Sequence, residues 1–116
     1  MMVKFLAGTA LSLIALPLWA EPTLSIPLPL TEEISVLPTE YTCADGEVLK
    51  VKYVNAGDNR LAILPIDGTE RIFVNVISAS GARYVAGEYE WWSKGDTASF
   101  TNQLEDQSVQ ECQSRE

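Results

Sequence analysis

The sequence predicts an all-β fold, a small antiparallel barrel of about eight strands. Short apolar or alternating segments follow one another from residue 41 onward, and glycine, aspartate and asparagine separate them. No stretch after residue 20 repeats its apolar residues with a helical period. With 116 residues, the chain is limited to one domain.

Residues 1–20 have the features of a secretory signal peptide. Lys4 supplies the positive charge, an apolar run follows it, and Ala20 is a suitable cleavage residue. No cysteine stands at the cleavage site, where a bacterial lipoprotein carries its lipid. We therefore expect a periplasmic protein that has no membrane anchor once the signal is removed.

Residues 21–40 contain four of the six prolines in the chain. Proline has no backbone N–H group, which disfavours both a regular helix and a central strand. We expect this segment to be an extended leader, ordered only near Tyr41. The folded domain is then expected to span residues 41–116.

The first three strands are predicted by an alternation of apolar and polar residues and by one turn dipeptide. In residues 48–54, Leu49, Val51 and Tyr53 fall on one face and two lysines on the other. Residues 61–66 and 71–77 flank Asp67-Gly68, a dipeptide typical of two-residue hairpin turns. Pro65 indicates that its strand lies at an edge or ends there.

Four further strands are expected, and the first two form a hairpin. If Gly87 alone makes the turn, Ser80 lies opposite Lys94 and Arg83 lies opposite Trp91, with the guanidinium over the indole. Because side chains alternate along a strand, Trp91 and its neighbour Trp92 point to opposite faces. The expected strands are residues 82–86, 88–93, 97–101 and 108–112.

The only two cysteines, Cys43 and Cys112, both lie in the exported part of the chain. In an oxidising compartment an even number of cysteines favours a disulfide. A loop of this length stabilises the folded state by roughly 4 kcal/mol on loop-entropy grounds.

The chain is strongly acidic. Removing residues 1–20 takes away one of the 8 basic residues and leaves 7 against 16 acidic ones, a net charge of −9. Nucleic acids and anionic membranes repel such a protein. The charge favours a cationic partner, although it can also serve solubility alone.

The available side chains argue against an enzyme. The chain has no histidine, which removes the usual general base and the commonest metal ligand. It has neither a glycine-rich phosphate loop nor a zinc-binding spacing, so we expect no cofactor and no metal. Glu88 and Glu90 could act as paired carboxylates, but at this spacing on a strand they are more typical of a solvated face.

Two segments carry a resemblance to a known family. Ser80-Gly-Ala-Arg-Tyr84 and Trp91-Trp-Ser-Lys-Gly95 are similar to the signature of the MliC/PliC inhibitors of c-type lysozyme. The stretch that opens with Tyr41-Thr-Cys also resembles the start of that domain, so the resemblance covers residues 41–112. It implies an eight-stranded barrel with one disulfide and a protein that is not an enzyme.

The resemblance also implies a partner and a site. Ser80 and Lys94 match the family's serine and lysine, which reach into the cleft of c-type lysozyme and contact its catalytic carboxylates. The matching motif residues Gly81, Arg83, Tyr84 and Gly95 complete the expected contact surface. The alternative is a periplasmic barrel that kept the scaffold as a binding or adaptor module for another protein.

Overall fold

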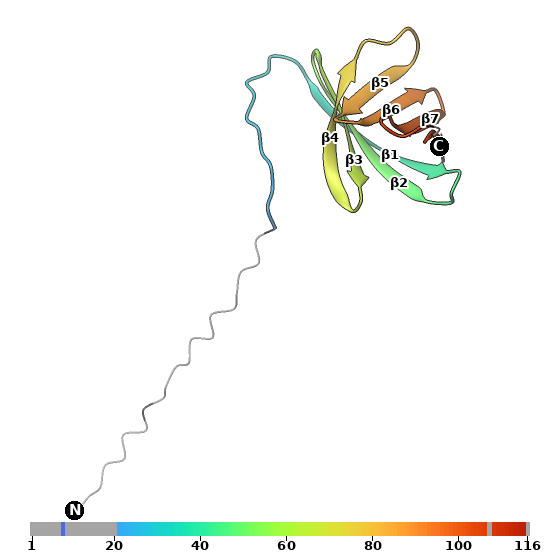
Figure 1. Ribbon diagram of the computed structural model, residues 1–116. Helices are drawn as coiled ribbons and strands as arrows, with labels where there is room; N and C mark the ends of the chain where they lie inside the picture. The colour runs from blue at the N-terminus through green and yellow to red at the C-terminus, as the bar shows by residue number, and fades with distance from the viewer. Residues whose placement is uncertain (1–7, 9–20, 107, 116) are drawn as a thin grey trace, which may run out of the picture.

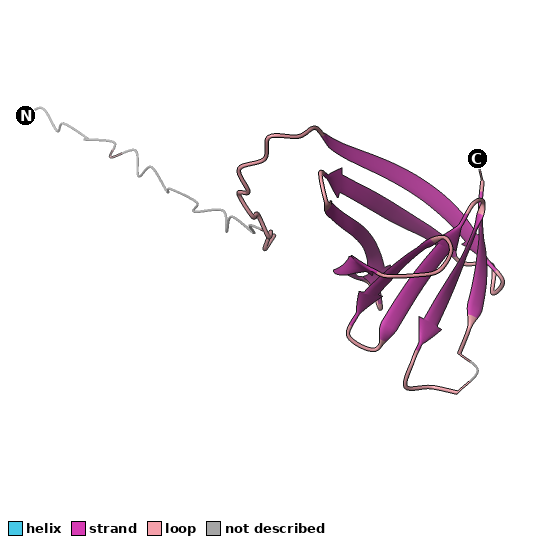
Figure 2. Cartoon of the chain, turned by 90° about the horizontal axis from the view of Figure 1, so that it is seen from above, coloured by secondary structure: helices cyan, strands magenta, loops and turns pink. Residues whose placement is uncertain are grey.

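Eight antiparallel strands close into a barrel in the computed structural model, which describes residues 8, 21–106 and 108–115 (Figure 1). Each strand pairs with the next, and β8 pairs with β1. The described residues contain strands and loops but no helix (Figure 2), which confirms the all-β prediction. The strands are β1 (Ile34–Cys43), β2 (Val48–Ala56), β3 (Asn59–Ile66), β4 (Thr69–Val76), β5 (Ala82–Ala86), β6 (Tyr89–Lys94), β7 (Thr97–Asn102) and β8 (Gln110–Ser114).

The predicted signal peptide lies outside the described residues, except for one position. Among the residues that the structure describes, we find no helix with the length and apolar character needed to cross a membrane.

Several strand predictions are confirmed. Val51 and Tyr53 of β2 point into the barrel, and Lys50 and Lys52 are exposed. Asp67 and Gly68 connect β3 to β4 with φ of 50° and 80°. Positive φ at both central residues is what a type I′ hairpin turn requires.

Strand β1 begins earlier than expected, at Ile34 instead of near Tyr41. It pairs with β2 from Ile34 onward, whereas its pairing with β8 covers only the last three residues, from Tyr41. Pro38 therefore lies in a stretch of β1 that has a hydrogen-bonded neighbour on one side only, where a missing N–H is tolerated. The proline-rich segment thus contributes most of a long strand, from Ile34 to Glu40.

The register of the β5–β6 hairpin corrects the expected pairing by one residue. Ala86 pairs with Tyr89, so the turn consists of Gly87 and Glu88 and not of Gly87 alone. Gly87 has a φ of 58°, as the first central residue of a type II′ turn does. Arg83 consequently lies opposite Trp92 and not Trp91.

The core fills the inside of the barrel. Its largest fully buried side chains are Trp91, Phe73, Leu64 and Val51. The Trp91 indole N–H donates to the Tyr53 hydroxyl at 2.9 Å, so the polar edge of this buried ring is satisfied. Trp91 is therefore the core tryptophan of the pair, and Trp92 lies on the outside.

The predicted disulfide joins Cys43 to Cys112. The two cysteines face each other across β1 and β8, whose pairing extends over three residue pairs only. The disulfide therefore reinforces the short seam at which the barrel closes.

Candidate functional site

The candidate site lies at one end of the barrel, where the β4–β5 loop (residues 77–81) meets the β6–β7 turn. Gly81 brings the two together, because a Cβ added to it would collide with the Ser93 carbonyl oxygen and crowd the Lys94 side chain. Gly81 also has a φ of 66°, which side chains disfavour. Only glycine fits comfortably at this contact, which places the Ser80 loop directly against Lys94.

A single side chain, Trp92, holds both parts of the site. Its indole N–H donates to the Ser80 carbonyl oxygen at 2.8 Å. The Lys94 ammonium nitrogen lies 4.3 Å from the centre of the Trp92 ring, within the range of a cation–π contact. Ser80 and Lys94 are not the directly opposed pair that the sequence predicted, but they share this indole.

Lys94 is available to a partner. Its side chain is exposed at the end of β6, and it forms no ion pair within the described residues. Ser80 is exposed as well, and its hydroxyl makes no hydrogen bond to any residue that the structure describes. The site therefore presents a cation and a hydroxyl to the outside.

Arg83 is engaged within the barrel wall. Its Nε donates to Glu90 at 2.6 Å, and the Gln103 amide donates to the same carboxylate oxygen at 2.8 Å. The Arg83 guanidinium lies 6.0 Å from the Trp92 ring centre, and not over Trp91 as expected. Because Glu90 neutralises Arg83, Lys94 carries the uncompensated positive charge next to Trp92.

Tyr84 is buried, unlike the exposed Ser80 and Lys94 of the expected contact surface. It is only 5% exposed and packs from inside the barrel, 5.7 Å from Tyr53 between ring centres. Burial raises the pKa of its hydroxyl above the usual value, so Tyr84 stays neutral. Gly95, by contrast, lies where the motif placed it, in the turn after Lys94 with a φ of 58°.

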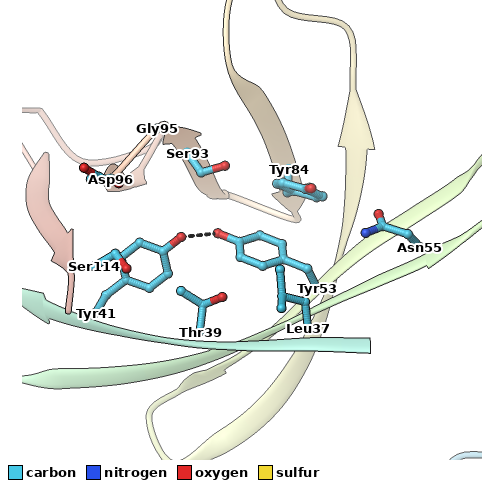
Figure 3. Close-up of a pocket in the computed structure, with 10 residues that line it drawn as sticks. All are labelled: Leu37, Thr39, Tyr41, Tyr53, Asn55, Tyr84, Ser93, Gly95, Asp96 and Ser114. Atoms are coloured by element: carbon cyan, nitrogen blue, oxygen red, sulfur yellow. Dashed lines mark hydrogen bonds between the residues drawn. The ribbon is translucent and has the colours of Figure 1, made fainter. Parts of the chain in front are cut away.

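A pocket of about 340 Å³ opens at the mouth of the barrel beside the site (Figure 3). The Tyr41 and Tyr53 hydroxyls share a 2.7 Å hydrogen bond in its wall. The pocket reaches Ser93, Gly95 and Asp96, the neighbours of Lys94 in sequence.

Glu90, one of the two carboxylates that the sequence offered as a pair, is bound by other side chains. Glu90 is held by Arg83 and Gln103, so it is not poised beside Glu88 as a catalytic pair. No group of three or more metal-binding side chains occurs among the described residues. Sequence reasoning did not find the bridging role of Trp92, because the indole binds a backbone carbonyl that only the fold brings near.

Comparisons with known proteins bear on the same segments. The family model MliC, described as membrane-bound lysozyme-inhibitor of c-type lysozyme, matches residues 41–108. Two relatives named membrane-bound lysozyme inhibitor of C-type lysozyme are similar to this chain. The one from Pseudomonas aeruginosa is 45% identical over 63% of this chain, and the one from Cupriavidus necator is 41% identical over 60%. The matches span 58% and 56% of the length of these two relatives.

A solved structure has the same architecture. It is Pseudomonas aeruginosa MliC in complex with hen egg white lysozyme, and it matches with a TM-score of 0.72 and 37% identity. The match covers 83% of this chain and 99% of that one. With more than half of its residues matched by the family model, this eight-stranded barrel belongs to the MliC family, the membrane-bound lysozyme-inhibitors of c-type lysozyme.

Proposed function

We propose that this protein inhibits c-type lysozyme by inserting Ser80 and Lys94 into the lysozyme cleft. The observation that carries the proposal is the free ammonium of Lys94, held against Trp92 while the same indole fixes the Ser80 loop. A small, preorganised projection of this kind loses little conformational entropy when it enters a cleft. Two further observations support c-type lysozyme as the partner: the names of the two relatives, and the solved complex of Pseudomonas aeruginosa MliC with hen egg white lysozyme.

The chemistry of the target explains how a lysine blocks it. Lysozyme needs one protonated carboxyl as general acid and one ionised carboxylate. An ammonium placed between them pairs with the ionised group and lowers the pKa of the other, which then loses its catalytic proton. Lys94 therefore occupies the subsite and disables the acid at the same time, and the Ser80 hydroxyl supplies a hydrogen bond.

Charge favours the encounter. The chain without residues 1–20 carries 7 basic and 16 acidic residues, and the proposed partner is a basic protein. Asp96 lies in the β6–β7 turn, two residues after Lys94. Long-range attraction between opposite net charges accelerates association and weakens as salt is added.

The decisive experiment is a turbidity assay of c-type lysozyme on bacterial cells, with purified protein added in increasing amounts. We expect lysis to stop near stoichiometric addition. Lysis at the full rate in the presence of excess folded protein would refute the proposal. A barrel that folds normally but forms no lysozyme complex in size-exclusion chromatography would instead favour an adaptor role with another partner.

We further propose that the protein acts in the periplasm. The Cys43–Cys112 disulfide supports an oxidising compartment, and lysozyme attacks the cell wall there. Release of the protein with the periplasmic fraction is expected, and sedimentation with the membranes would contradict this proposal.

A further inference from the structure

The outer surface of the barrel carries an apolar face that the proposed inhibition does not use. Its core is a continuous row of aliphatic side chains that runs across five strands, with further aliphatic residues beside it. Antiparallel sheets with one buried face usually show polar residues on the other. The row is Val36, Val54, Leu61, Val74 and Val85, each paired with the next across neighbouring strands, with Ile63 and Ile72 paired beside it.

This outer apolar face is open to solvent. Val36 is 57% exposed, Val74 is 51% exposed and Ile72 is 39% exposed. Since Val51, Leu64 and Phe73 fill the inside, this wall is apolar on both sides. Contiguous apolar surface of this kind on a folded protein marks a place that something else covers.

The leader has a matching pattern. Leu24, Ile26, Leu28 and Leu30 occur at every second position, so an extended chain presents them on one side. The first three are 72%, 64% and 58% exposed. The prolines of this segment already restrict its backbone, which reduces the entropy lost when it is ordered.

The path of the leader brings it back over the same wall. Just before β1, the carboxylate of Glu32 lies against Gly57 in the β2–β3 turn, in the space that a Cβ there would need. Further toward the N-terminus, Leu24 and Ile26 line a hollow of about 840 Å³ together with Ile63 and Ile72. Figure 1 shows this segment in blue beside β4, and Figure 2 shows it folded back next to the barrel in the second view.

We propose that residues 21–30 are a strap that docks on the outer apolar face of their own barrel, with Leu24 and Ile26 against Ile63 and Ile72. Closing the hollow removes apolar area of both partners from water, which drives the contact. The short link through Glu32 keeps the strap at high effective concentration, which favours its own barrel over a second copy. This assignment does not depend on the lysozyme proposal.

The test uses protein that contains residues 21–116 and a dye that fluoresces on apolar surface. Replacing Ile26→Ser removes an apolar side chain, yet it should raise dye fluorescence about threefold because the weakened strap uncovers Ile63 and Ile72. Leu104→Ser is the control, since Leu104 is 84% exposed in the loop after β7. It should produce no increase. Ile26 lies outside the barrel, so its replacement leaves the fold intact.

Methyl NMR on the same protein identifies which barrel holds the strap. Contacts between the Ile26 and Ile72 methyl groups within one molecule are expected. Unchanged or lower dye fluorescence in Ile26→Ser would overturn the proposal. So would Ile26–Ile72 contacts that appear only between labelled and unlabelled molecules, because a second copy would then be the occupant.

Discussion

The Lys94 ammonium lies 4.3 Å from the centre of the Trp92 indole, whose N–H binds the carbonyl of Ser80. One aromatic side chain therefore fixes the position of the cation and of the loop beside it. Because both contacts are made before any partner arrives, we infer that Trp92 sets the geometry with which the site meets lysozyme.

Replacing Trp92 should weaken inhibition in two steps. Trp92→Phe keeps a ring under Lys94 but removes the N–H, and the loss of one hydrogen bond of about 1 kcal/mol predicts an inhibition constant roughly fivefold higher. Trp92→Leu also removes the cation–π contact, so its inhibition constant should rise further. Titration of lysozyme activity measures both, and wild-type inhibition by Trp92→Leu would show that the indole has no positioning role.

Lys94→Ala should be far more damaging than the loss of another lysine. Truncating one partner of a desolvated charge pair costs about 2–5 kcal/mol, which corresponds to at least a 30-fold weaker inhibitor. Lys50→Ala is the matched control, since Lys50 is exposed on β2. Equal effects of the two substitutions would indicate that bulk charge, and not insertion, causes inhibition.

Gly81→Ala should reduce both stability and inhibition. The added Cβ meets the Ser93 carbonyl oxygen and the Lys94 side chain in a backbone conformation with φ of 66°. Gly87→Ala is the control, with a φ of 58° but no heavy atom within 4 Å of the added Cβ. In urea unfolding, the free energy of unfolding should fall by about 1 kcal/mol for Gly87→Ala and by more for Gly81→Ala. Equal losses would mean that the loop moves aside freely.

Alkaline pH should destabilise the barrel through Tyr84. Burial raises the pKa of this hydroxyl above its usual value of 10.0, so the folded state holds the proton more tightly than the unfolded state. The corresponding stability is complete below pH 10 and is lost as pH rises through the raised pKa. The free energy of unfolding should fall less steeply in this range for Tyr84→Phe, and an identical slope would contradict the assignment.

Local chemistry made much of the fold predictable. Asp67-Gly68 defines its turn without help from the rest of the chain, and the alternation around Val51 defines the inward face of β2. The register of β5 and β6 was not predictable in this way, because Glu88 is no typical turn residue and only pairing decides that it shares the turn with Gly87. The early start of β1 at Ile34 depends on long-range pairing with β2. The prolines in this segment predicted the opposite, because they disfavour a strand.

The candidate site likewise has some features that the local sequence predicts and others that depend on the fold. The motif proposed Ser80 and Lys94 as contact residues, but it did not separate buried Tyr84 from the exposed members of the same segment. Burial depends on which face of β5 turns inward, and a one-residue shift in register exchanges the faces. The Trp92 contact with the Ser80 carbonyl depends in addition on the path of the β4–β5 loop.

The position at which the chain enters the barrel has a consequence for access. Ile34 pairs with Ala56 beside the β2–β3 turn, and in an up-and-down barrel this turn lies at the same end as Gly81 and Lys94. An untethered leader would sweep through the volume that an approaching enzyme has to occupy. By folding back along the wall, residues 21–30 clear that volume, so the strap serves the approach of the partner without touching it.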